Sequence, residues 1–229
     1  MLERYEQQVI SHSALLAELA GYARPNDKIS ELVRSGTLTR LKKGLYTLSD
    51  NPQLSRELVA NHLHGPSYVS CHWALSYYGL LSEAVAGVSS ICIDRAREYS
   101  NSLGRFTYHS VPTSYYKFGL TSQSLSGQSL TGQSLTAHRL TARGFTGEGG
   151  GLSAFVIATP TKALCDLLVT TRLIRIQSRR AMLEYLFDDL RLNEADVAAL
   201  DLQIVKDCLT AQYKTQILTN LSKAIESAS

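Results

Sequence analysis

The stretch from Arg24 to Leu48 reads RPNDKISELVRSGTLTRLKKGLYTL. Its first half predicts a short helix, with Asn26 as the N-cap and Gly36 just past the C-terminal end. Its second half changes to a period of two and carries a turn at 42–44, which predicts a β-hairpin. A short helix followed at once by a hairpin is typical of the recognition helix and wing of a winged helix-turn-helix.

The same stretch is locally basic, with six Lys and Arg against two acidic residues between positions 24 and 43. Ile29, Leu32 and Val33 share one face of the expected helix, so its polar side chains lie on the opposite face. The helix residues are expected at base edges, and the lysines of the hairpin tip at phosphates. A solvated basic face that binds nothing is the alternative. The candidate DNA contacts are Arg24, Asn26, Lys28, Ser30, Arg34, Arg40, Lys42 and Lys43.

Composition describes an ordinary globular protein. The 229 residues, 44% of them hydrophobic, suffice for one large domain or two modest ones. A net charge of +3 is too small to imply a nucleic-acid partner by itself, so the local cluster carries that argument. No apolar run approaches the ~20 residues of a membrane-spanning helix, and residues 1–6 do not resemble a signal peptide. A cytoplasmic protein without a membrane partner is expected.

The cysteines form no C-x-x-C pair, and their apolar surroundings predict buried thiols. His62, His64, Cys71 and His72 cluster in the sequence and invite a metal hypothesis. Their spacing matches no established ligand pattern, so packing is favoured, and neither a metal nor another cofactor is expected. The four cysteines are Cys71, Cys92, Cys165 and Cys208.

Residues 1–50 are expected to form the winged-helix domain. A first helix is predicted over 2–12, and a second begins at an N-cap, Ser11 or Ser13, and ends near Gly21. The segment Asp50–Pro52 then indicates a hinge.

Residues 51–229 are expected to form a second, helix-rich α+β domain. The β-branched and aromatic runs predict strands at 88–93, 104–109, 115–118 and 155–158. Thr159 and Pro160 supply an N-cap and first helical position, and Asn193 with Asp196 resembles a capping box. Helices are expected over 54–63, 70–78, from 160 onward, and at 177–190, 194–201, 203–211 and 213–226.

An apolar residue recurs at every fifth position from Leu120 to Phe145, separated by Ser, Thr, Gln and Gly. A period of five is typical of pentapeptide-repeat β-helices, but Gln occupies places where those folds need small residues. Six short repeats are also too few to bury a core. We therefore interpret residues 121–151 as a low-complexity insertion, with a short β-helix coil as the alternative.

Three blocks of the chain together resemble the AbiEi family, the antitoxin and transcriptional-repressor half of type IV toxin–antitoxin systems. The blocks are Arg40–Tyr46, Pro66–Leu80 and Ala158–Leu168, in the family's order. The resemblance implies an N-terminal domain that binds an inverted repeat in double-stranded DNA and represses its own operon. It also implies a C-terminal domain that opposes a nucleotidyltransferase-like toxin, classically without a stable complex. The repeat insertion departs from the family's pattern.

The sequence contains two further runs of charged residues outside the stretch 24–48. Arg172, Arg175, Arg179 and Arg180 either extend the DNA footprint or form a solvated face balanced by later acids. The run from Asp94 to Glu98 favours a charged hairpin loop over a catalytic group.

No catalytic motif is present in the sequence: it lacks a phosphate-binding glycine loop, a Gly-x-Ser-x-Gly elbow and a nucleotidyltransferase pattern. Catalysis is therefore not expected. The main alternative to DNA binding is a protein-interaction module that neutralises a partner by direct contact. A weaker alternative is an enzyme that acts on nucleic acid through the C-terminal domain.

Overall fold

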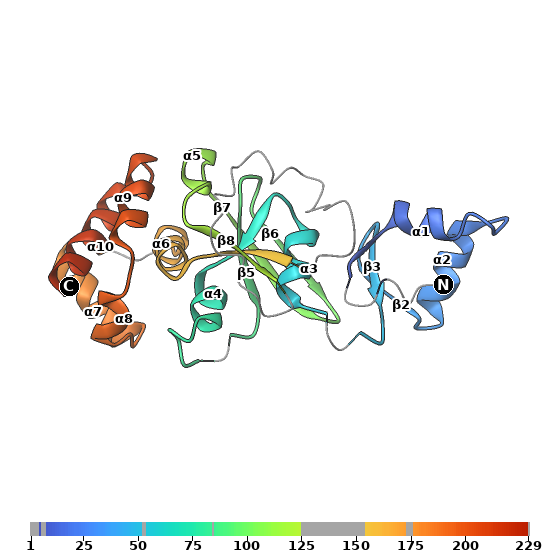
Figure 1. Ribbon diagram of the computed structural model, residues 1–229, viewed down its shortest axis with the longest axis horizontal. Helices are drawn as coiled ribbons and strands as arrows, with labels where there is room; N and C mark the ends of the chain where they lie inside the picture. Colours follow the sequence, from blue (N-terminus) through green and yellow to red (C-terminus); the bar gives the residue numbers. More distant parts are fainter. Residues whose placement is uncertain are drawn as a thin grey trace.

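The helix and the hairpin expected within residues 24–48 are both present in the computed structural model, which describes residues 5, 8–51, 54–83, 85–124, 154–172 and 176–228. The molecule is elongated. Its N-terminal unit occupies one end, a six-stranded sheet the middle, and the C-terminal helices the other end (Figure 1). The α+β class expected from the sequence is confirmed.

The N-terminal unit pairs two helices with a small antiparallel sheet. The helices are α1 (His12–Glu18) and α2 (Pro25–Arg34). The sheet has the order β1 (Ile10–Ser11), β3 (Leu45–Leu48) and β2 (Leu38–Lys42). The second strand of the hairpin, β3, therefore lies between β1 and the first strand of the hairpin, β2.

Helix boundaries in this unit test the capping predictions. Ser11 is the N-cap of α1, and its side chain accepts a hydrogen bond from the amide of Ala14. The prediction of Asn26 as N-cap is wrong: Arg24 is the N-cap, and α2 begins at Pro25, two residues earlier than predicted. Proline already has a helical φ and needs no amide partner at the first position. Gly36 follows α2 with φ +76°, as expected of a residue past a helix end.

The helix expected over 2–12 is wrong at residues 8–11, although His12 is helical as the first residue of α1. Ile10 and Ser11 form strand β1, paired with Tyr46 and Leu45 of β3. The pairing places Ile10 in an apolar core with the helices of the unit, which a helix at this position does not achieve. Residues 1–4 and 6–7 lie outside the described residues. The core consists of Ile10, Leu15, Leu19, Ile29, Leu38 and Tyr46.

The central sheet has the strand order β6-β7-β5-β4-β9-β8. The pairs β4–β9 and β5–β7 are parallel, and the other neighbours are antiparallel. Strand bounds are β4 (Ser67–Val69), β5 (Val88–Cys92), β6 (Arg97–Asn101), β7 (Gly104–Ser110), β8 (Leu120–Ser124) and β9 (Ala154–Ala158).

Helix α6 lies between this sheet and the C-terminal helices, and packs against α4, α9 and α10 (Figure 1). Nine of its residues are buried, which explains its nearly continuous apolar sequence. The sheet-side helices are α3 (Arg56–Leu63), α4 (Cys71–Tyr77), α5 (Thr113–Tyr116) and α6 (Pro160–Thr170). The C-terminal group is α7 (Arg179–Glu184), the π-helical turn η3 (Tyr185–Asp189), α8 (Glu194–Ala198), α9 (Leu202–Thr210) and α10 (Thr215–Ala228).

Three sequence predictions for the second unit need correction. Residues expected as a strand at 115–118 instead end helix α5, because a helical turn after Pro112 buries both Tyr115 and Tyr116. The expected loop at 94–98 gives way to strand β6 from Arg97 onward. The expected insertion at 121–151 begins too early, because its first residues complete strand β8 against β9.

Residues 125–151, the rest of that insertion, lie outside the described residues. Capping signals elsewhere are confirmed: Thr159 caps α6, and Asn193 with Asp196 forms the capping box of α8. None of the helices in the described ranges combines the length and apolar character needed to cross a bilayer.

Candidate nucleic-acid interface

The outer face of α2 presents a row of polar side chains. Asn26, Ser30 and Arg34 are four residues apart, so they lie along one side of the helix, and all three are exposed. Ile29, on the opposite side, is 3% exposed and packs into the core of the N-terminal unit. The structure therefore brings these three predicted contacts together on one surface.

Other polar groups of α2 are engaged within the helix itself. Lys28 lies 2.7 Å from Glu31, and Arg24 lies 3.7 Å from Asp27. The hydrogen bond to Glu31 raises the pKa of Lys28. The Ser30 hydroxyl donates to the carbonyl of Asn26 at 2.9 Å. Two of the three cations of this segment are thus partly neutralised before any ligand arrives.

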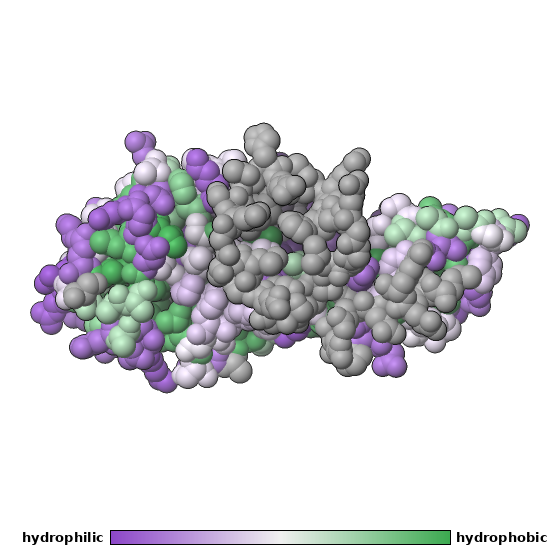
Figure 2. Space-filling model, in the orientation of Figure 1, coloured by the Kyte–Doolittle hydropathy of each residue, from purple (hydrophilic) through white to green (hydrophobic). Residues whose placement is uncertain are grey.

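Three cations of the N-terminal unit remain available. Arg34, Arg40 and Lys43 are exposed, and none forms an ion pair with another residue in the described part of the chain. Lys43 lies in the two-residue turn of the hairpin beside Gly44, whose φ of +81° is easily adopted by glycine. Hydrophilic residues occur at both ends of the elongated molecule (Figure 2).

Lys42 does not lie at a free hairpin tip. Its ammonium donates to the carbonyl oxygen of Leu63, the last residue of α3, at 2.6 Å. Partial burial, together with nearby Arg97, lowers the pKa of Lys42. The expectation that this side chain projects from an exposed wing is therefore corrected: it links the hairpin to the second unit.

The hairpin turns inward because of a bulge. Arg40 pairs with Tyr46 and Lys42 with Leu45, so Leu41 is an extra residue on strand β2. Leu41 and Leu45 are buried in the core of the second unit. The side-chain amide of Asn101 on β6 also donates to the carbonyl of Leu41 at 3.4 Å. At this end of the hairpin, Leu41 and Lys42 are thus engaged in contacts with the second unit, whereas Lys43 is exposed.

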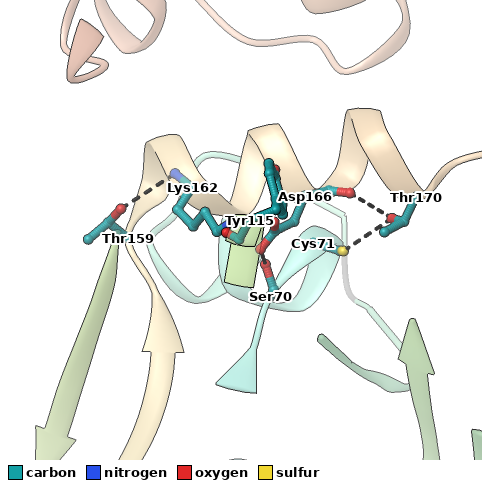
Figure 3. A network of polar contacts seen from close by, with 7 residues as sticks. All are labelled: Ser70, Cys71, Tyr115, Thr159, Lys162, Asp166 and Thr170. Carbon is teal, nitrogen blue, oxygen red and sulfur yellow. Dashed lines mark hydrogen bonds and ion pairs between the residues drawn. The ribbon is translucent and has the colours of Figure 1, made fainter. Parts of the chain in front are cut away.

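Residues 158–168, one of the three blocks that resemble the AbiEi family, contribute to a buried polar network and not to an exposed surface. Lys162 and Asp166 make an ion pair at 3.0 Å with both side chains 0% exposed. Ser70 donates to Asp166 at 2.6 Å, and the Lys162 ammonium donates to the carbonyl of Tyr115 at 3.2 Å (Figure 3). This network joins α6 to β4 and α5, so these residues hold the second unit together.

The same lysine also contacts aromatic rings. Its ammonium lies 3.4 Å from the ring centre of Tyr115, which is an enclosed cation–π contact. Burial raises the pKa of both Tyr115 and Tyr68 well above the usual value, so both phenols stay neutral. Both side chains of the ion pair are fully buried among the described residues, so we assign it a structural role.

The histidine–cysteine cluster of the sequence is divided between two elements. His62 and His64 lie at the end of α3, whereas Cys71 and His72 begin α4. Among the described residues, no three His, Cys, Asp or Glu side chains come together as a metal site. All four cysteines are buried free thiols, as their apolar surroundings predict.

The second basic run is exposed where it is described. Arg180 pairs with Glu184 at 2.9 Å on α7, and Arg179 lies beside it on the surface. Arg172 belongs to a separate place, the end of α6, and Arg175 lies outside the described residues. The described arginines of this run therefore lie at two elements, the end of α6 and the start of α7.

Comparison with known proteins gives no assignment: no protein-family model matches this chain, and no curated protein is detectably similar to it.

Proposed function

We propose that this chain is a DNA-binding transcriptional regulator of the AbiEi type, and that its N-terminal unit acts as a winged helix. The support is the order of its elements: strand β1, helices α1 and α2, then a hairpin that pairs back onto β1. In helix-turn-helix proteins the second helix of the pair enters the major groove. Helix α2 has that place here.

The observation that carries the proposal is the exposed row on α2. Asparagine pairs well with adenine and arginine with guanine in the major groove, so Asn26 and Arg34 have the chemistry for reading bases. Arg40 and Lys43 are exposed cations without an ion-pair partner among the described residues and serve as phosphate contacts. Lys42 is left out of the contact set because its ammonium already bonds to Leu63.

The regulatory part of the proposal rests on the family resemblance. The protein would repress its own operon at an inverted repeat and oppose a nucleotidyltransferase-like toxin in the cytoplasm, without itself being an enzyme. Two of the three resemblance blocks supply β4, α4, the last residue of β9 and most of α6, at the centre of the second unit. The polar residues of these two blocks, Ser70, Lys162 and Asp166, form the buried network described above, so their role is to stabilise the fold.

The test is binding of the full chain to DNA from upstream of its own gene, measured by fluorescence anisotropy between about 50 and 200 mM salt. A random duplex of equal length runs beside it. Arg34→Ala is expected to weaken upstream binding and to reduce the preference over the random duplex. The control is Lys223→Ala, which removes one exposed cation on α10. Equal binding to both duplexes at every salt concentration would refute sequence-specific recognition.

A second candidate is a protein-interaction module that neutralises a partner by contact. The internal ion pairs Arg24–Asp27 and Lys28–Glu31 favour it, because they reduce the positive charge that α2 offers to phosphates. This candidate predicts a complex with a neighbouring gene product that persists as salt rises, together with no DNA binding at low salt. Size-exclusion chromatography of the two proteins separates the candidates.

A further inference from the structure

A groove opens on the second unit where the end of α6 approaches the end of β7. It consists of two adjoining hollows, with volumes of about 360 and 510 Å³. Both are lined by His109, Thr170, Thr171 and Arg172, so they are continuous with each other. Each volume lies within the range of small-molecule sites in proteins.

The groove is lined by basic groups. Arg172 and Lys214 are exposed at its edge, and His72 and His109 line its walls. Among the residues that the structure describes, no Asp or Glu lines either hollow. The pKa of His109 is lowered, first by burial and also by Arg172 and His72, although Asp166 behind it acts in the opposite direction. The exposed cations Arg172 and Lys214 at the edge of the groove therefore favour an anion.

The two hollows differ in what surrounds the cations. The larger one adds the ring of Tyr213, held edge-on against Tyr115 at 5.5 Å, and the hydroxyl of Ser110. The hydroxyls of Thr170 and Thr171 donate to backbone carbonyls of α6 at 2.6 Å. Their protons are therefore engaged, and toward a ligand these hydroxyls can only accept a hydrogen bond. The arrangement offers cations for an acidic group and an aromatic ring for an apolar remainder.

Two residues of the groove adopt a backbone conformation that is costly without glycine. Lys214 has φ +51° and Cys71 has φ +54°. Such a conformation costs about 1–2 kcal/mol per residue and is often found at functional sites. In the turn between α9 and α10, this conformation holds Lys214 at the edge of the groove next to Tyr213.

We propose that this groove binds a small phosphate-bearing molecule of about mononucleotide size, with Arg172 and Lys214 on its phosphate and Tyr213 against its ring. Arginine presents a fork of donors that matches phosphate oxygens, and lysine adds a point charge. The site lies in the sheet-containing unit and not on α2, so it does not depend on DNA binding.

The test uses the full chain, with the histidine ring signals followed by NMR during titration with adenosine monophosphate, inorganic phosphate and adenosine. We expect saturable binding of adenosine monophosphate, with shifts of the His109 and His72 signals, weaker binding of phosphate, and little binding of adenosine. Arg172→Gln is expected to reduce affinity at least about tenfold, since it removes a charge-assisted hydrogen bond. The control Arg179→Gln should bind as the unchanged protein does, and thermal melts establish that both variants are folded.

Three results would overturn the proposal. The first is no saturable binding of adenosine monophosphate or phosphate up to about 10 mM. The second is equal binding of adenosine and its monophosphate, which would mean that the cations do not contact the ligand. The third is a shift of the His109 signal by duplex DNA but not by adenosine monophosphate, which would make the groove part of a nucleic-acid surface. Loss of DNA binding in Arg34→Ala leaves the first two readouts unchanged, because neither involves DNA.

Discussion

The ammonium of Lys42 lies 2.6 Å from the carbonyl oxygen of Leu63, so the hairpin of the N-terminal unit is bonded to the C-terminal end of α3. A cation at this end of a helix complements the partial negative charge of its last carbonyls. The bond connects the unit that carries α2 to the unit that carries the central sheet. Any change at the groove or in the sheet that shifts α3 therefore reaches the hairpin directly.

Lys42→Met should lower the free energy of unfolding by about 1 kcal/mol, because it removes a hydrogen bond from a charged donor while relieving the cost of burying that charge. DNA binding by this variant should depend on salt as it does for the unchanged protein. Urea unfolding and the anisotropy series measure the two quantities. A salt slope reduced by about one, with unchanged stability, would return Lys42 to the phosphate contacts.

Lys43→Met should behave in the opposite way. Lys43 is exposed in the hairpin turn, and no residue of the described ranges forms an ion pair with it. Its removal should reduce the salt slope of DNA binding by about one and leave urea unfolding unchanged. Lys223→Met, on the exposed side of α10, is the control. An identical effect of the two substitutions on DNA binding would show that Lys43 acts only through overall charge.

Local signals in the sequence predicted much of the fold. Ser11, Thr159 and Asn193 each cap a helix as expected, since a cap depends on residues three positions apart. The helix–hairpin order of residues 24–48 was also predictable, since both elements are written in one continuous stretch.

Predictions failed where distant residues decide the outcome. The tyrosines of α5 have strand propensity, but helix α5 buries both of them in the core. Lys42 was expected at a free tip, because the sequence does not show that Leu41 forms a bulge and enters the core of the second unit.

The groove was not predicted, because its basic side chains come from four separate segments. His72 follows β4, His109 ends β7, Arg172 follows α6, and Lys214 precedes α10. The sheet order and the packing of α6 on α4, α9 and α10 bring these segments together. The positive φ of Lys214 was likewise invisible, since no glycine marks the turn.

The buried pair of Lys162 and Asp166 gives a large expected effect. Lys162→Met removes the cation that pairs with the Asp166 carboxylate and leaves that carboxylate in the interior, bonded to Ser70. It should cost about 3–5 kcal/mol of unfolding free energy. The double variant Lys162→Met, Asp166→Leu should recover a large part of this loss, because no unpaired charge remains buried. Urea unfolding of the two proteins measures the difference. A double variant no more stable than the single one would show that packing, and not charge, dominates.

Acidification should destabilise the fold through its buried histidines. Burial, with Lys42 nearby, lowers the pKa of His62 from its usual value of 6.5, and burial likewise lowers that of His109. As the pH falls through 6.5, the unfolded chain binds protons on these rings, and the folded chain does so only at lower pH. The unfolding free energy is therefore greatest above the unfolded pKa and decreases as the pH falls toward the folded one.

Urea unfolding at about pH 7.5 and about pH 5.5 measures this decrease. His62→Gln should reduce it, since glutamine cannot take up the proton that favours the unfolded chain. Lys223→Ala, which changes an exposed charge on α10, should leave it as it is. If His62→Gln loses as much stability on acidification as the unchanged protein, the decrease comes from other groups, and the histidine beside Lys42 does not contribute to the pH response of the fold.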